Sequence, residues 1–189
     1  MIKTLRAKGN YPDIEVDFKE VDLVGAENVE AVLAQVTDMK VVTAQKTAVV
    51  QARPAVLGEK VETNPRCEIG GYIYILGETE QEIQQKHVDR GDVIVENPDG
   101  ELYVVNGQKF PKKYDAVEDG YKPVDGPKKF VTVTEDICFK APWGEMIFSP
   151  KGSKLCVEYI DSRDIYSVTN VAFDVTYQGI DIADEDEND

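Results

Sequence analysis

The chain has 189 residues, of which 42% are hydrophobic and 30% charged, a composition typical of a folded globular protein. Its 36 acidic and 21 basic residues give a formal charge of -15, which repels a phosphate backbone and argues against direct nucleic-acid binding. No segment approaches the roughly 18 apolar residues of a membrane span, and the first residues lack the apolar run of a signal peptide. We therefore expect a protein of the cytoplasm.

The first 52 residues predict a segment with a strand, a helix and further β structure. Apolar residues alternate over 13–21, which is typical of a half-buried strand. Apolar residues with helical spacing over 26–36 predict a short amphipathic helix. The β-branched residues over 41–52 predict one or two strands before Arg53-Pro54.

Residues 66–92 predict a strand, a helix and the start of a second β region. The strand covers Tyr72 to Leu76, and Thr79 and Glu82 form a capping-box pattern that predicts the first turn of the helix. β structure resumes after Gly91.

Two stretches of the chain, 91–114 and 152–177, share one pattern. In each, a glycine precedes an apolar strand, and three aromatic residues follow at intervals of seven and four. The matched positions are Gly91, Tyr103, Phe110 and Tyr114 in the first copy and Gly152, Tyr166, Phe173 and Tyr177 in the second. We interpret this as an internal repeat; the alternative is chance recurrence of glycine, tyrosine and turn residues in a β-rich chain.

Each copy predicts a β-hairpin followed by one or two turns of helix. Aromatic residues four apart lie on one helical face and can pack together onto the hairpin. Pro111 is tolerated only in the first helical turn, so the helix of the first copy should be little more than a 3₁₀ turn. A single hairpin is marginally stable alone, which favours two units that complete each other's sheet or form two small barrels.

The predicted fold is therefore a β-rich α+β protein, with tandem hairpin-plus-short-helix units in small-barrel-like packing. The expected divisions are an N-terminal segment over 1–52, a first unit over 53–118, a second unit over 119–178 and a disordered acidic tail over 179–189.

The motifs GDVIV, DGELYVV, YKPVDGPKKFV, APWGE and DIYSV occur in this order across residues 49–177. As a set they resemble uncharacterised proteins of bacteria and bacteriophages that are grouped under a PGDYG signature. In this chain Arg90-Gly91-Asp92-Val93 stands where that signature has Pro-Gly-Asp-Tyr. The resemblance implies a phage or prophage context, and it brings no catalytic residues to this sequence.

The single histidine, His87, is a weak catalytic candidate. A general base needs an orienting partner, and Asp89 or Asp92 could serve only by folding back onto the ring. A lone helical histidine beside Lys86 and Arg90 is more typical of a solvated surface.

The three cysteines, Cys67, Cys138 and Cys156, contain no CxxC pair and predict buried free thiols in a reducing compartment. Together with His87 they could supply four zinc ligands, but structural zinc sites usually contain at least one close cysteine pair. We expect no metal and no cofactor.

Among the carboxylates, Asp99-Gly100-Glu101 has the pattern of a turn, whereas Glu145 and Asp136 could line a site for a metal or a sugar. Gly70-Gly71 precedes a strand and does not join a strand to a helix, so it does not predict a phosphate loop.

The predicted interaction residues are Trp143, Glu145 and the acidic tail. Trp143 at a hairpin tip could be an exposed interface anchor, or its ring could fold over the sheet end as core. The tail could serve solubility, dock into a basic groove or extend a nucleic-acid-mimicking surface. Its candidate residues are Asp184, Glu185, Asp186 and Glu187.

The function that the sequence favours is a non-enzymatic, phage-associated structural or protein-binding accessory module with an acidic surface. Its expected partner is a protein with a basic surface, and short edge strands also allow a homo-oligomer. One alternative is an acidic inhibitor or nucleic-acid mimic that occupies a basic site on a host enzyme, and another is a small hydrolase with a carboxylate site. The expected location is the host cytoplasm or the virion.

Overall fold

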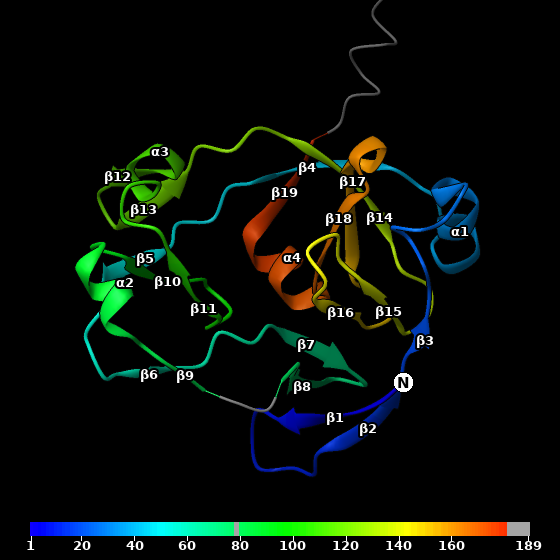
Figure 1. Ribbon diagram of the computed structural model, residues 1–189, viewed down its shortest axis with the longest axis horizontal. Coiled ribbons are helices and arrows are strands. Elements are labelled where there is room, and N and C mark those ends of the chain that lie inside the picture. The colour runs from blue at the N-terminus through cyan, green and yellow to red at the C-terminus, as the bar shows by residue number, and fades with distance from the viewer. Residues whose placement is uncertain (78–79, 181–189) are drawn as a thin grey trace, which may run out of the picture.

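The computed structural model describes residues 1–77 and 80–180 (Figure 1). The protein is a β-rich α+β protein, with 45% of the described residues in strands and 15% in helices, and several small sheets. This confirms the predicted fold class. The helices are α1 (Val29–Val36), α2 (Gln85–Asp89), α3 (Phe110–Lys113) and α4 (Asn170–Thr176), with a 3₁₀ helix η1 at Ile160–Ser162.

The second unit is a five-stranded antiparallel sheet in the order β18-β17-β14-β4-β19. Its strands are β4 (Val42–Lys46), β14 (Lys128–Thr132), β17 (Lys154–Tyr159), β18 (Asp164–Val168) and β19 (Tyr177–Ile180). Helix α4 follows the β17–β18 hairpin, as the repeat predicts, and leads into strand β19, which the repeat did not predict and which forms the other edge of the sheet (Figure 1).

The strands of the first unit follow the same order, but they form two separate sheets. A three-stranded sheet, β11-β10-β5, and a two-stranded sheet, β12-β13, are joined by a bridge between Val50 and Tyr121, whose backbone groups exchange hydrogen bonds of 2.8 and 2.9 Å. The strands are β5 (Gln51–Pro54), β10 (Val93–Glu96), β11 (Leu102–Val105), β12 (Tyr114–Val117) and β13 (Gly120–Pro123). The order β11-β10-β5-β13-β12 therefore matches β18-β17-β14-β4-β19.

The register of the two hairpins is the same up to Cys156, after which only the second hairpin has a β-bulge, before Tyr159. Val95 pairs with Tyr103 in the first unit, and Cys156 pairs with Tyr166 in the second. Val95 and Cys156 each stand four residues after the repeated glycine, and both are fully buried. The equivalent residues thus occupy equivalent places in two separate cores.

The aromatic residues pack alike in both units. The rings of Phe110 and Tyr114 are stacked with centroids 5.1 Å apart, and those of Phe173 and Tyr177 are stacked at the same distance. A T-shaped ring contact supports each phenylalanine from the neighbouring strand, from Tyr121 in the first unit and from a buried phenylalanine of β14 in the second. Both copies have the phenylalanine and the tyrosine four residues apart because this spacing brings the two rings into stacking contact.

Strand pairing crosses the boundaries that the sequence suggests. Strand β4 comes from the expected N-terminal segment but lies in the sheet of the second unit. The β12–β13 hairpin continues past residue 118, and β19 includes Gly179 and Ile180, which the sequence assigns to the tail. All strands of the first unit lie between β4 and β14, so this unit is inserted between two neighbouring strands of the second.

The remaining elements cover the outer faces of the units. Helix α1 begins after Asn28, whose side chain accepts a hydrogen bond from the backbone N–H of Ala31, and packs its apolar face on the second unit. The other strands form three sheets. One contains β1 (Ile2–Ala7), β2 (Ile14–Asp17), β7 (Arg66–Ile69) and β8 (Tyr72–Ile75), and a second contains β3 (Lys19–Glu20), β15 (Ile137–Lys140) and β16 (Met146–Ser149). The third consists of β6 (Lys60–Val61) and β9 (Gln81–Glu82).

The helix expected from the capping-box pattern begins later than predicted. Glu82 lies in strand β9, where it pairs with Lys60, and helix α2 begins at Gln85. Thr79 lies outside the described residues. The prediction of a helix starting at this box is therefore wrong, because cross-strand pairing holds Glu82 in extended conformation.

Strand β7 is attached to helix α4 of the second unit by a pair of side-chain hydrogen bonds. The side chain of Asn170 accepts from the backbone N–H of Glu68 and donates to its carbonyl, both at 3.0 Å. This double contact fixes β7 against α4, and it places Pro65 between the two units.

A close backbone approach fixes the entrance to α3. A Cβ atom at Gly107 would lie 2.3 Å from the carbonyl oxygen of Gly91 and 2.7 Å from that of Arg90. We expect Gly107→Ala to lower the free energy of unfolding by about 2 kcal/mol or more, because the backbone cannot yield as a side chain can. Gly126→Ala is the matched control, since a Cβ there meets no atom within 4 Å. Urea unfolding measures both, and equal effects would contradict the close packing.

Candidate functional site

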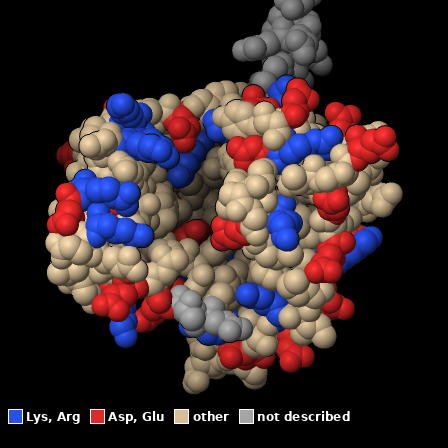
Figure 2. Space-filling model, in the orientation of Figure 1, with Lys and Arg blue, Asp and Glu red and all other residues tan. Residues whose placement is uncertain are grey.

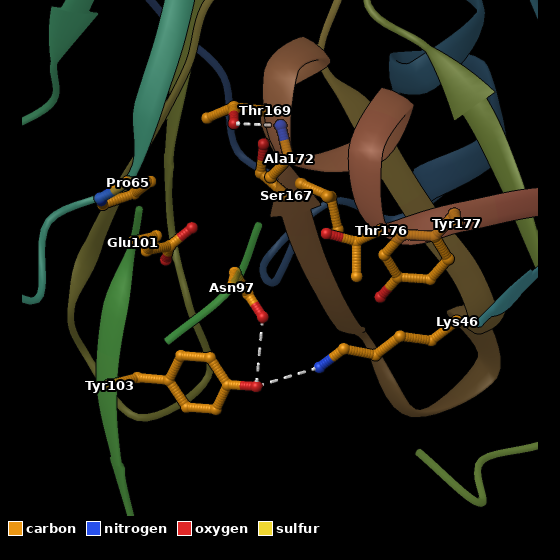
Figure 3. A pocket seen from close by; sticks show the side chains of 11 residues that line it. Lys46, Pro65, Asn97, Glu101, Tyr103, Ser167, Thr169, Ala172, Thr176 and Tyr177 are labelled. Carbon is orange, nitrogen blue, oxygen red and sulfur yellow. Dashed lines mark hydrogen bonds between the residues drawn. The ribbon is translucent and has the colours of Figure 1, made fainter. Parts of the chain in front are cut away.

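A pocket of about 200 Å³ lies between the two units (Figures 2 and 3). The first unit contributes the β10–β11 turn and Tyr103, and the second contributes β4, the end of β18 and one face of α4. Figure 2 shows the molecule hollowed between the two units. The pocket is therefore a product of how the repeat copies face each other, and neither copy forms it alone.

Lys46 extends from the second unit into the first. On β4 it pairs with Tyr177, and its ammonium donates hydrogen bonds to the hydroxyl oxygens of Tyr103 (3.3 Å) and Tyr114 (3.4 Å). It also lies 5.3 and 5.7 Å from the centroids of these two rings, within cation–π range. The phenol groups of Tyr103 and Tyr114 are hydrogen-bonded to each other.

The turn over 97–101 positions Glu101 on the opposite wall. The backbone N–H of Gly100 donates to the carbonyl of Asn97 at 2.9 Å, and Gly100 has a φ of +89°, which glycine adopts without strain. The Asp99 side chain accepts from the backbone N–H of Glu101 at 3.1 Å. The predicted turn chemistry is therefore present, and its result is a carboxyl group that faces the pocket (Figure 3).

Burial raises the pKa of Glu101 to about 7, and the neighbouring Asp99 acts in the same direction. The positive charges of Arg66 and Lys46 act against this shift. Arg66 is 7% exposed and lies against Gly100, and among the described residues its Nε and Nη1 atoms have no hydrogen-bond partner. Glu101 can therefore be a neutral donor or a charged acceptor near neutral pH.

Helix α4 supplies two threonines to the second wall. Thr169 caps the helix, because its hydroxyl oxygen accepts from the backbone N–H of Ala172. Thr176 is 2% exposed, and its hydroxyl has no hydrogen-bond partner among the described residues. A buried hydroxyl without a partner is costly. Figure 3 shows this hydroxyl turned toward the wall that carries Glu101.

A second cavity, a groove of about 300 Å³, adjoins the pocket and shares Pro65, Ser167 and Thr169 with it. It runs along two strands that each lie at the edge of a sheet, β16 and β18. The hydroxyls of Ser149 and Ser167 connect these strands at 2.8 Å. Its apolar wall consists of Pro65, Leu76, Met146, Ile147, Phe148 and Tyr166.

The Trp143 loop lies next to this groove. Trp143 is 61% exposed, and its indole N–H donates to the carboxylate of Glu145 at 3.0 Å. The turn closes with a hydrogen bond of 2.9 Å from Gly144 to Ala141. Of the two readings of Trp143, the structure thus has the exposed ring, and Glu145 both holds the ring and lines the groove.

The other predicted candidates lie apart from the two cavities. The side chain of Asp136 accepts from the backbone N–H of Lys151 and so stabilises a turn. The four tail residues, Asp184, Glu185, Asp186 and Glu187, lie outside the described residues. Cys67, Cys138 and Cys156 are buried free thiols, and burial raises the pKa of Cys67 to about 12. Over residues 1–77 and 80–180, no three histidine, cysteine or carboxylate side chains cluster as metal ligands would.

His87 does have an orienting partner. Its Nδ1 lies 2.8 Å from Asp92, which is 2% exposed and also accepts from Arg90 (2.9 Å) and from the backbone N–H of Gly107 (3.1 Å). Burial alone would raise the pKa of Asp92, but the hydrogen bonds from His87 and Gly107 and the charge of Arg90 lower it overall. Asp92 thus connects α2, β10 and the entrance to α3.

Sequence reasoning did not single out Lys46 or Thr176, and it assigned Glu101 only to a turn. Glu101 lies 55 positions after Lys46, and Thr176 lies 75 positions after Glu101. No local motif connects them. Tyr103 and Tyr177, which the repeat singles out, also line the pocket, one from each unit.

Comparison of the chain with protein-family models, curated proteins and solved structures gives no significant match. Within the described part of the chain, the helices are too short or too polar to cross a bilayer.

The raised pKa of Glu101 predicts a pH-dependent contribution to stability. Because the pKa is about 4.5 in the unfolded chain and about 7 in the fold, this contribution is fully present below pH 4.5 and is lost as the pH rises through 7. We expect the stability of Glu101→Gln relative to the original protein to increase by on the order of 2–3 kcal/mol from pH 4.5 to 7.5. Urea unfolding at several pH values measures this.

The control for this prediction is Glu118→Gln, since Glu118 is exposed on the first unit. Its stability relative to the original protein should stay constant over the same pH range. A pH-independent difference for Glu101→Gln would contradict the burial of this carboxyl group.

Proposed function

We propose that the chain is a non-enzymatic protein-binding module that holds an extended, positively charged segment of a partner protein in the groove between β16 and β18. The observation that carries the proposal is the combination of two edge strands, an apolar wall and an exposed tryptophan at one end of a single groove. Edge strands offer unpaired backbone groups to an added extended chain, and side-chain pockets beside them select its residues.

The charge of the groove supports a basic segment. Glu145 lies at one end beside Trp143, and the chain as a whole carries a formal charge of -15. A cationic side chain at this end would meet the carboxylate of Glu145 and the face of an aromatic ring, both of which favour it. Exposed tryptophan is also the residue type that most often anchors a protein interface.

This proposal includes a phage or prophage context. The resemblance of residues 49–177 to proteins grouped under the PGDYG signature supports that context. In that context the module would act as an assembly or accessory factor in the host cytoplasm or on the virion. The acidic inhibitor and the carboxylate-site hydrolase stay predictions of the sequence, as does self-association through edge strands.

The test is a selection from a random peptide library displayed on a carrier, followed by binding measurements with synthetic eight-residue peptides. We expect enrichment of extended sequences that alternate apolar residues with lysine or arginine. Trp143 is the only tryptophan of the chain, so its fluorescence should shift to shorter wavelength when a peptide covers it. Raising the salt from about 0.15 to about 0.5 M should weaken binding, because it screens exposed charge pairs.

We expect Trp143→Ala to weaken peptide binding by about tenfold or more, as truncation of an interface anchor does. Glu145→Gln should weaken the same peptides and reduce the salt dependence. Leu57→Ala is the control, since Leu57 is 54% exposed and lies outside the groove. Selected peptides that bind Trp143→Ala as tightly as the original protein, or a selection without basic residues, would overturn the proposal.

A further inference from the structure

We propose that the pocket between the two units binds a small zwitterionic molecule of the size and chemistry of a free amino acid. The groove along β16 is the site of the function proposed above, and this inference concerns the adjoining pocket and goes beyond it. Its basis is that three polar groups with unused hydrogen-bonding capacity, on Lys46, Glu101 and Thr176, line one small cavity from two facing walls.

The first group is the ammonium of Lys46. It carries three N–H bonds, and in the described part of the chain two of them are used, by Tyr103 and Tyr114. The third N–H is available to an acceptor in the pocket. The ammonium therefore presents a positive charge at the hydroxyl ends of the two phenols, within the pocket lining.

The second group is the hydroxyl of Thr176, on the same side of the pocket as Lys46. Thr176 is only 2% exposed, and its Oγ1 has no hydrogen-bond partner among the described residues. The neighbouring Tyr177 adds a phenol hydroxyl to this wall. An ammonium and two hydroxyl donors together match the oxygens of a carboxylate, because charge-assisted hydrogen bonds are the stronger ones.

The third group is the carboxyl of Glu101 on the opposite wall (Figure 3). Over residues 1–77 and 80–180 its side chain forms no ion pair or hydrogen bond. A ligand ammonium within contact distance would favour the charged form of this carboxyl group and would be its natural partner. Asn97, in the same turn, lines the pocket beside it.

The size of the pocket restricts the ligand. Its volume of about 200 Å³ equals the space that roughly seven water molecules occupy in the liquid, which suits a ligand of roughly six to ten non-hydrogen atoms. A ligand with a carboxylate at one end and an ammonium at the other satisfies the donors of one wall and the acceptor of the other. A ligand with a single charge would leave one wall without a partner, which costs affinity.

The test is thermal unfolding of the full chain with each of the twenty standard amino acids at about 5 mM. A ligand that binds only the folded state raises the midpoint temperature Tm. We expect at least one amino acid to raise Tm, and its N-acetyl and carboxamide derivatives, which each lack one charge, to have no effect. If no amino acid raises Tm, or if both derivatives act as well as the parent, the inference is wrong.

Two variants assign the effect to the pocket. Thr176→Val keeps the shape of the side chain but removes the hydroxyl, and it should weaken binding of the amino acid by about tenfold, whereas Thr176→Ser should restore it. Lys46→Met should abolish the effect. Unchanged binding by Thr176→Val and Lys46→Met would overturn the assignment. Peptide binding reported by Trp143 fluorescence is measured on the same variants, so failure of one proposal is distinguishable from failure of the other.

Discussion

The ammonium group of Lys46 is the contact on which the relation of the two units depends. It belongs to a strand of the second unit and is held by two phenols of the first, so one side chain couples two separate cores. Partial removal from water is costly for a cation, and here two hydrogen bonds to phenol oxygens offset part of that cost. Lys46 lines the pocket, so this contact joins the facing walls at the pocket itself.

The repeat could be predicted from the sequence because it rests on local geometry. Phe110 and Tyr114 stack because four residues separate them on one turn of chain, and a two-residue difference in the hairpin turn does not disturb that interval. The same reasoning did not place β4 correctly, since its partners β14 and β19 are more than eighty residues away and local pattern carries no information about them. The candidate pocket escaped prediction for the same reason, as Lys46, Glu101 and Thr176 each look ordinary in their own segment.

The two adjoining cavities have different chemistry. The groove along β16 has an apolar wall and an exposed aromatic ring at its end, which are features of an interface with another chain. The pocket has opposite charges on facing walls and a buried hydroxyl without a partner, which are features of a site for a small polar molecule. Because Pro65, Ser167 and Thr169 border both, occupation of one cavity contacts the boundary of the other.

The insertion of the first unit between β4 and β14 imposes an order on biosynthesis. The strands of the first unit are complete once residue 123 has left the ribosome, whereas β4 must wait for β19, whose Tyr177 pairs with Lys46. At translation rates of about 5–20 residues per second, the 54 residues from 123 to 177 take about 3 to 11 seconds. Once β14 has paired with one side of β4, the other side keeps unpaired backbone groups until β19 arrives.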